Sequence, residues 1–386
     1  MSQSADTSLT GAGATPWDTS EPDQPITRLV ESLLEKYDPD QRLHLSGSPF
    51  AELPGHVREA VLASASERGY APSRGDPRLR EAIAASLAPR GIHVSPGQVL
   101  VTDGAMHALD LVFRSVLGPG DEVLMPAPGF FIDGLVRRAG GRLVHFPSPA
   151  TGRFRPSWAA ARALVTSRTR VLYVNTPVNP TGYVYDESDV SAATELAGEA
   201  GLLLVSDESL SHFVYGGRRH LSPAAGAPRR PGGVLVGSFS KDYAMPGMRV
   251  GYVVLPANLV RQVSAMLEWS VLSVSRSAQA AALAALAGPH DWVEAMVADA
   301  AGRGRRVASE LNAIARLSCI PPSGGLNLFP GFAGDAERLT HDLVVRFGVP
   351  VCPGSAFGGP GYFRVQFGGA EQDLGLAVQR IRDAAV

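Results

Sequence analysis

Residues 171–182 read VLYVNTPVNPTG, an apolar run that turns at once into Asn, Pro and Gly. The same pattern returns in LLLVSDES at residues 202–209 and in VLVGSFSK at residues 234–241. Short apolar runs bounded by turn residues are typical of buried strands. Because a helical pattern separates the first two runs, the sequence indicates right-handed crossovers and a mostly parallel sheet.

This alternation of strand and helix extends over most of the chain. Candidate strands lie at residues 98–101, 122–125, 142–146, 170–174, 202–206, 234–236 and 250–254. Helical patterns fall near residues 105–117, 130–139, 157–166 and 187–200. The sequence therefore predicts an α/β fold, with a large domain whose mostly parallel seven-stranded sheet is flanked by helices.

The pattern changes on both sides of this large domain, which we place at residues 51–256. Residues 1–22 are rich in Ser, Thr, Gly, Asp and Pro, so we expect a flexible leader there, and residues 23–50 are expected to join the smaller domain. Longer helices are expected near residues 257–287 and 291–316, followed by a mixed β/α tail from residue 324. Residues 257–386 are thus expected to form an interdomain helix and a smaller α+β domain.

One helix start inside the large domain is clear from its capping residues. Asp76 is followed by Pro77, which is favoured in the first turn of a helix. Leu79, Ile83 and Leu87 then recur at helical spacing. We therefore expect a helix that begins after Asp76 and buries this apolar face.

Composition limits the classes of function. The 386 residues are 45% hydrophobic and 19% charged, with a formal net charge of −2, so the chain is globular and shows no basic face for nucleic acid. The apolar stretch Ala278–Ala287 is too short to cross a membrane, and no secretory signal is visible. Only Cys319 and Cys352 occur, which excludes a disulfide framework and a zinc ribbon, and we expect no metal. We expect a soluble cytoplasmic protein without nucleic-acid or membrane partners.

Lysine is almost absent from the chain. Of 35 basic residues, only Lys36 and Lys241 are lysines, and the others are arginines. Arginine can replace lysine wherever a solvated positive charge is enough, but it cannot become a neutral amine nucleophile. Lys36 fits an exposed helix face, whereas Lys241 follows an apolar run and is the candidate for a chemical role.

The polar ends of the apolar runs carry a complementary set of groups. Ligands of open α/β sheets bind beyond the carboxyl ends of the strands, where the three runs quoted above lead to Asn179, Asp207 and Lys241. Residues 98–101 lead to TDGAM at residues 102–106 and then to a helix, whose free N–H groups suit a phosphate. An amine, a carboxylate, an amide donor and a phosphate cup are what pyridoxal phosphate requires.

Six motifs give the chain a resemblance to a known family. They are YAPSRG at residues 70–75, TDGAM at 102–106, NPTG at 179–182, Asp207-Glu208, SFSK at 238–241 through RVG at 249–251, and GYFR at 361–364. In this order and spacing, over roughly residues 40–380, the sequence resembles class I/II aminotransferases of the fold-type I pyridoxal-phosphate-dependent enzymes. The resemblance implies transfer of an amino group between an L-amino acid and a 2-oxo acid, with pyridoxal 5′-phosphate as cofactor.

The same resemblance implies roles at the reacting centre. Lys241 would form the Schiff base with the cofactor and move the proton at the substrate Cα. Asp207 would pair with the pyridine nitrogen, and Asn179 would donate to O3′ beside the substrate. Arg364 would clamp the substrate α-carboxylate, with Gly47 approaching the same group.

The resemblance also implies how the phosphate is held. Its binding residues would be Gly104, Ala105, Met106, Ser238, Ser240 and Arg249. Tyr70 would reach the phosphate of the neighbouring subunit, which implies a homodimer with shared active sites.

The chain departs from the family pattern beside the cofactor ring. The family usually has a tyrosine three residues after the pyridine aspartate, where this sequence has Leu210. Ser209 would lie beneath the ring, where a small apolar residue is common. We choose Phe130 as the ring-stacking aromatic residue, with core packing as its alternative role.

These departures concern the tuning of the cofactor and leave other reactions open. A lyase, or an oxygen-using oxidase or decarboxylase, on the same scaffold is the alternative to transamination. An effector-sensing transcription regulator would need a DNA-binding module. About 40 residues with little periodicity precede the matching region, so this alternative is disfavoured.

Overall fold

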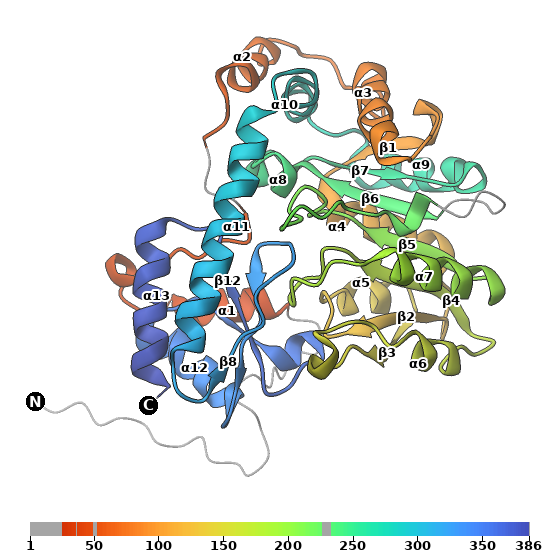
Figure 1. Cartoon of the computed structure of the whole chain (residues 1–386). Helices are drawn as coiled ribbons and strands as arrows, with labels where there is room; N and C mark the ends of the chain where they lie inside the picture. Colours follow the sequence, from red (N-terminus) through yellow and green to blue (C-terminus); the bar gives the residue numbers. More distant parts are fainter. Residues whose placement is uncertain (1–24, 36, 49–51, 226–232, 386) are drawn as a thin grey trace, which may run out of the picture.

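The computed structural model describes residues 25–35, 37–48, 52–225 and 233–385. Its largest feature is a seven-stranded sheet of order β1-β7-β6-β5-β4-β2-β3 (Figure 1). The strands are β1 (Val99–Thr102), β2 (Glu122–Ala127), β3 (Arg142–Pro147), β4 (Thr169–Asn175), β5 (Leu203–Asp207), β6 (Val234–Ser238) and β7 (Gly251–Val254). Each strand expected from the sequence is therefore present.

Most neighbouring strands run parallel, as predicted. The pairs from β3 through β2, β4 and β5 to β6 are parallel, whereas β7 is antiparallel to both β6 and β1. The carboxyl ends of β4, β5 and β6 consequently lie along one edge, where Asn175 is opposite Asp207. This edge carries the polar turns that follow the apolar runs.

Helices cover both faces of the sheet, which explains why its strands are apolar on both sides. Along β4, Val171 and Tyr173 pack in one core cluster, and Leu172 and Val174 pack in another. The first cluster includes residues of α4 (Gly104–Val116), α5 (Asp133–Arg138) and α9 (Ala257–Val271), and the second includes residues of α6 (Trp158–Ala163) and α7 (Glu187–Glu199). The sheet is thus the middle of three layers.

The helix expected after Asp76 is α3 (Pro77–Leu87). The Asp76 carboxylate accepts a hydrogen bond from the backbone N–H of Arg78 at 2.9 Å and caps the helix. Its apolar face is buried, as predicted. Two shorter helices precede it, α1 (Ile26–Leu34) and α2 (Gly55–Ser64).

The prediction of a single long helix near residues 257–287 is wrong. This stretch forms two helices, α9 and α10 (Arg276–Ala287), with a break between them. The α9 helix ends at Val271 because Leu272 has φ 60°, a left-handed conformation that cannot continue a right-handed helix. The chain turns there, and α10 packs on α2 and α3.

The last third of the chain forms a separate set of elements. The 22-residue α11 (Asp291–Asn312) extends from beside the sheet to these elements (Figure 1). They are α12 (Ala336–Phe347), α13 (Glu371–Ala384), the pair β10-β8 (Gly331–Phe332 and Leu317–Ser318) and the sheet β11-β12-β9 (Cys352–Pro353, Phe363–Gln366 and Asn327–Leu328). The N-terminal α1 packs on α12. Within the described residues, no helix combines the length and the apolar character needed to cross a membrane.

Candidate active site

A cavity of about 320 Å³ lies at the carboxyl ends of β4, β5 and β6. Its lining includes Asp207 at the end of β5, together with Ser240 and Lys241 from the four-residue helix α8 (Phe239–Asp242). Of the residues assigned from the sequence, only Gly104 and Tyr70 lie outside this lining. The fold therefore brings together residues that are far apart in the chain.

Lys241 provides an amine to the cavity. The hydroxyl of Ser238 accepts a hydrogen bond from the N–H of Ser240 at 3.1 Å, and α8 begins at this cap. Burial, and then the positive charges of Arg364 and Arg249, lower the pKa of Lys241 to about 8. The neutral, nucleophilic amine is therefore populated near neutral pH.

Asp207 provides a buried carboxylate to the same cavity. Its Oδ2 accepts a hydrogen bond from the hydroxyl of Tyr173 at 3.0 Å. Its Oδ1 accepts from the N–H of Ser209 at 3.0 Å and from the Ser209 hydroxyl at 2.5 Å. Burial raises the pKa of Asp207, while these hydrogen bonds act in the opposite direction. A buried carboxylate held in this way is stabilised when a cationic group binds beside it.

Arg364 reaches the cavity from β12. Its Nη1 donates to Oδ1 of Asn179 at 3.4 Å, and its Nη2 lies 3.3 Å from Sγ of Cys352. The rings of Phe131 and Phe357 lie 5.8 and 4.9 Å from its guanidinium carbon. The Nε of this buried arginine has no hydrogen-bond partner among the described residues, so a donor is free for an anionic ligand.

The N-terminus of α4 and Arg249 form an anion cup. Asp103 precedes α4 without a side-chain hydrogen bond to it, so the N–H groups of the first turn are available. Gly104 has φ 78°, and a Cβ atom there would lie 2.6 Å from Nη2 of Arg249. The positive φ favours glycine at position 104, and the missing Cβ leaves room for Arg249, although Gly104 does not line the cavity itself.

The N-terminal segment at residues 46–48 joins the cavity to the C-terminal elements. The N–H of Gly368 donates to the carbonyl oxygen of Ser46 at 2.8 Å. The hydroxyl of Ser48 donates to the carbonyl oxygen of Ser240 at 3.0 Å. Gly47, between them, lines the cavity as predicted. A Cβ atom at Gly47 would lie 2.2 Å from the side chain of Gln366, so glycine allows this close packing.

The roles assigned to the aromatic residues Phe130 and Tyr70 remain predictions. Phe130 lines the cavity, and its ring centroid lies 4.5 Å from that of Phe131. Tyr70 lies outside the cavity, and its side chain is 81% exposed. Their proposed contacts with the cofactor and with a second subunit therefore belong to the proposal below.

Sequence reasoning missed several residues of the site. Tyr173 lies inside an apolar run, and its alternating pattern indicates only a core position. Asn327 and Gln366 are opposite each other in the β9–β12 pair and both line the cavity. The β9 strand has two residues, which is too short for a periodic signal. Other lining residues that were not assigned from the sequence are Thr27, Phe131, Asn175 and Pro246.

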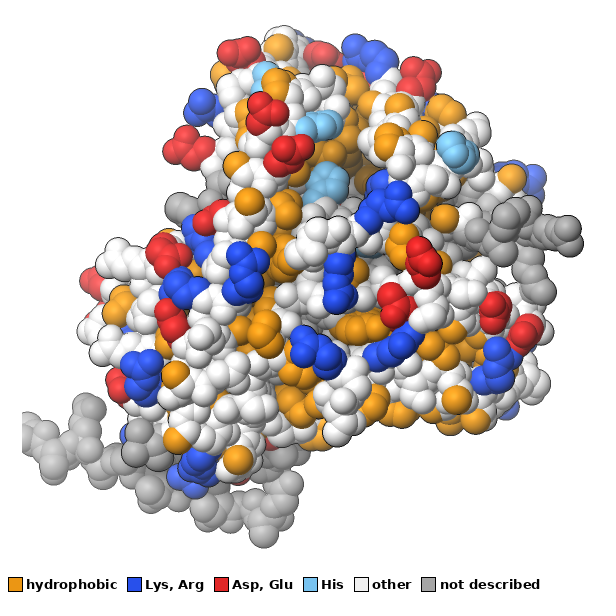
Figure 2. Space-filling view, in the orientation of Figure 1, with side chains coloured by type: hydrophobic (Ala, Val, Ile, Leu, Met, Phe, Trp, Pro, Cys, Tyr) orange, Lys and Arg blue, Asp and Glu red, His pale blue; other side chains and the backbone are white. Residues whose placement is uncertain are grey.

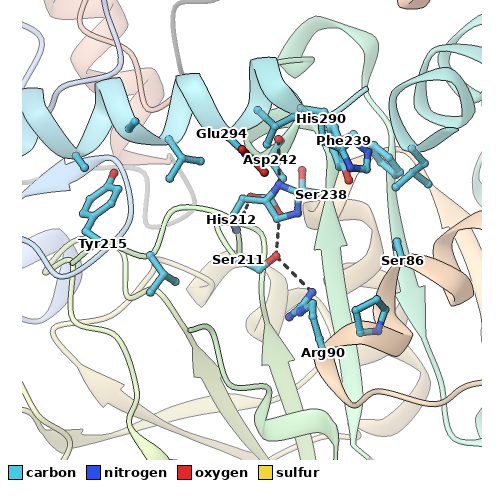
Figure 3. A pocket seen from close by; sticks show the side chains of 18 of the residues that line it. Ser86, Arg90, Ser211, His212, Tyr215, Ser238, Phe239, Asp242, His290 and Glu294 are labelled. Atoms are coloured by element: carbon cyan, nitrogen blue, oxygen red, sulfur yellow. Dashed lines mark hydrogen bonds between the residues drawn. The ribbon is translucent and has the colours of Figure 1, made fainter. Parts of the chain in front are cut away.

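A larger cavity of about 710 Å³ lies on the other side of α8. Phe239 and Asp242 line this larger cavity, Ser240 and Lys241 line the smaller one, and Ser238 lines both. In the view of Figure 3, Asp242 and His212 lie below the cyan helix α11, and Arg90 lies farther below them beside Ser211. On the face shown in Figure 2, histidine and apolar side chains gather near the α11 and α3 helices.

Two charged residues of the larger cavity, Arg90 and Asp242, have partners in the surrounding structure. Arg90 forms an ion pair with the buried Glu208. Asp242 accepts hydrogen bonds from the hydroxyl of Ser211 at 2.8 Å and from the N–H of His212 at 3.2 Å. These contacts connect neighbouring residues in and behind the wall of the larger cavity.

The residues of the smaller cavity fit pyridoxal phosphate. The amine of Lys241 can bind the cofactor aldehyde, and the buried Asp207 can face a protonated ring nitrogen. The uncapped N-terminus of α4 and Arg249 suit the phosphate. Each part of the cofactor thus has a group of matching chemistry.

A family model described as aminotransferase class I and II matches residues 45–381. The chain belongs to the class I and II aminotransferases. Such enzymes use pyridoxal 5′-phosphate, so the family, the enzyme class and the cofactor predicted from the sequence are confirmed.

Proteins that are similar to this chain are also named as aminotransferases. A probable aspartate/prephenate aminotransferase from Aquifex aeolicus is 35% identical over 352 residues, which cover 88% of this chain and 89% of that protein. A single mutant of Thermus thermophilus aspartate aminotransferase superposes with a TM-score of 0.86 and 32% identity, covering 94% of this chain and 97% of that one. The aromatic aminotransferase from Pyrococcus horikoshii gives a TM-score of 0.84 and 30% identity, covering 92% and 98%. The fold-type I architecture is therefore confirmed.

Proposed function

We propose that this aminotransferase transfers the amino group between an L-amino acid and a 2-oxo acid, with Lys241 as its catalytic amine. The observation that carries the proposal is the chemical state of this lysine. It lies in the cavity beside two arginines, and its pKa is lowered to about 8. An amine in this state can attack a carbonyl and can also accept a proton.

The groups around Lys241 would divide the remaining work. Pyridoxal phosphate, when bound, supplies an electrophilic carbonyl and an electron sink. Lys241 would remove and return the proton at the substrate Cα. Asp207 would hold the proton on the ring nitrogen, and Phe130 would stack on the ring. The side-chain amide nitrogen of Asn179 would donate to O3′, because its oxygen already accepts from Arg364.

The anionic ends of cofactor and substrate would bind on different sides of the cavity. The phosphate would be held by the N–H groups of Ala105 and Met106, the hydroxyls of Ser238 and Ser240, and Arg249. Arg364 would bind the substrate α-carboxylate through its free Nε, close to Gly47. These two anchors would fix the orientation of the reacting carbon between them.

We also propose a homodimer in which Tyr70 completes the phosphate site of the partner. The exposure of this large side chain supports the proposal. The division into a large domain at residues 51–256 and a smaller one at 257–386, and the cytoplasmic location, remain predictions.

The role of Lys241 can be tested by chemical labelling. Borohydride reduction of the yellow holoenzyme is expected to attach the cofactor to the peptide that contains Lys241. Lys241→Ala should abolish this label and lower kcat by about 10⁴-fold, because it removes the proton-transferring amine. Lys36→Arg is the matched control and should keep both label and activity. A label at Lys36 would refute the assignment.

Subunit mixing tests the shared site. If Tyr70 acts in the partner, a heterodimer of a Tyr70→Phe chain and a Lys241→Ala chain has one wholly wild-type site and one site with both defects. The mixture should therefore be more active than the mean of the two parents. If Tyr70 acts within its own chain, the mixture should equal that mean.

A further inference from the structure

The positive charges in the active-site cavity restrict which substrates it can hold. Among the described lining residues, the positive side chains are Lys241, Arg249 and Arg364. Under the proposed function, these three bind the cofactor aldehyde, its phosphate and the substrate α-carboxylate. No positive side chain of the described lining is left for a second carboxylate on the substrate.

The wall next to Arg364 is apolar. The ring of Phe131 packs 5.8 Å from the Arg364 guanidinium carbon and 4.5 Å from the ring of Phe130. Met106 lines the same cavity and is 38% exposed, a large fraction for an apolar side chain. Apolar side chains in the lining of a cavity favour an apolar group of the ligand.

The polar part of the remaining lining is neutral. Asn327 and Gln366 carry side-chain amides, which can form hydrogen bonds but cannot neutralise a carboxylate. The side chains of Asn327 and Gln366 therefore supply no counter-charge to a second carboxylate of the substrate.

We propose that this enzyme selects amino donors with an uncharged, apolar or aromatic side chain and discriminates against aspartate and glutamate. A second carboxylate moved from water into this cavity would lose its hydration without gaining a cation from the described lining of this chain. The 2-oxo acid binds in the same cavity, so phenylpyruvate should be a better acceptor than oxaloacetate. Met106 is the specificity-determining residue, because it is an uncharged residue that lines the cavity beside the anion cup.

This inference rests on the proposed function, and it separates the chain from those relatives whose names specify aspartate. Holoenzyme should be mixed with L-phenylalanine, L-leucine, L-methionine, L-aspartate or L-glutamate without an acceptor. The conversion of the bound cofactor is followed by its absorbance. The kcat/KM values of the three uncharged substrates should exceed that of aspartate by about 100-fold, the effect of leaving one buried charge without a partner.

Two variants test whether charge is the reason. Met106→Lys should raise the kcat/KM for aspartate by about 10-fold and lower that for phenylalanine, because it adds a cation to the cavity. Met106→Gln is the matched control of similar length without a charge, and it should give no gain for aspartate. Bound-cofactor absorbance and thermal melting establish that both variants are folded and loaded.

The outcomes separate the two proposals. Aspartate used as efficiently as phenylalanine would overturn the selectivity and leave the proposed function intact. An equal gain for aspartate in Met106→Gln and Met106→Lys would also overturn the role of charge at this position. Failure of every amino acid to convert a cofactor bound at Lys241 would overturn the proposed function and the selectivity together.

Discussion

Two cavities flank helix α8, and they differ in what their charged groups contact. In the larger one, of about 710 Å³, Arg90 is paired with Glu208. In the smaller one, of about 320 Å³, Lys241, Arg249 and Arg364 form no ion pair with a described carboxylate. The smaller cavity is the one that matches the cofactor. Unpaired positive charge on lysine and arginine, rather than volume, therefore distinguishes the cofactor-binding cavity from the larger one.

Two buried aspartates, one in each cavity, allow a direct test of which cavity takes part in catalysis. Burial raises the pKa of both Asp207 in the smaller cavity and Asp242 in the larger one. Asp207→Asn should lower kcat/KM by roughly 100-fold or more, because the ring nitrogen loses its anionic partner. Asp242→Asn should cost less than about 10-fold, because the asparagine oxygen can still accept from His212 or Ser211. Steady-state kinetics measures both, and equal losses would mean that the larger cavity takes part in catalysis.

Substitution of Arg364 tests the unpaired charge of the smaller cavity. Its positive charge is expected to act both on substrate binding and on the pKa of Lys241. Arg364→Leu should cost roughly 2–5 kcal/mol in kcat/KM. It should also raise the pKa of Lys241 from about 8 toward its ordinary value, because a nearby positive charge is lost. The neutral amine then appears at higher pH, so the pH midpoint for cofactor binding to the apoenzyme should move upward.

Arg364→Lys is the control for this change. It keeps the charge but loses the planar fork, so the midpoint should stay near that of the wild type while kcat/KM still falls. An unchanged midpoint in Arg364→Leu would show that Arg364 does not act on the lysine.

Substitution of Tyr173 tests how the smaller cavity keeps the Asp207 carboxyl ionised. Tyr173→Phe removes a hydrogen bond to Asp207 and should raise the pKa of that carboxyl further. Cofactor affinity should weaken about 10-fold, and the loss of affinity on acidification should begin at a higher pH. Tyr185→Phe is the matched control, because the buried Tyr185 hydroxyl has no hydrogen-bond partner among the described residues. If both variants have the same dissociation constant for the cofactor, the hydrogen bond to Asp207 has no role.

At Leu210 the expected effect is a shift in a spectroscopic midpoint and not a loss of activity. It lines the smaller cavity where the family usually has a tyrosine, and the hydroxyl of Ser209 is already donated to Asp207. Leu210→Tyr would add a donor to the negatively charged O3′ of the bound cofactor. The pH midpoint of the visible absorbance should fall by roughly 1–2 units. Leu210→Phe supplies the ring without the donor, and an equal shift in that variant would exclude hydrogen bonding as the cause.

The sequence predicts the sheet and the reacting groups well because both depend on local patterns. Short apolar runs mark the strands, and the strand ends place Lys241 and Asp207 on one edge. The break at Leu272 was not predicted, because a left-handed residue other than glycine has no compositional signal. Tyr173 and Asn327 were missed for another reason. Their contacts depend on how strands pair, and one apolar run alone does not specify its neighbour.

The hydrogen bond from Ser48 to the carbonyl oxygen of Ser240 has a mechanical consequence. Residues 46–48 are attached at one end to the C-terminal elements, through Ser46 and Gly368, and at the other end to the turn that carries Lys241. This segment is a strut between the two parts of the molecule. Any swing of the C-terminal elements away from the sheet must either break the strut or pull the peptide bond that precedes the lysine. Any opening of the cavity at these contacts would therefore also act on the orientation of the amine.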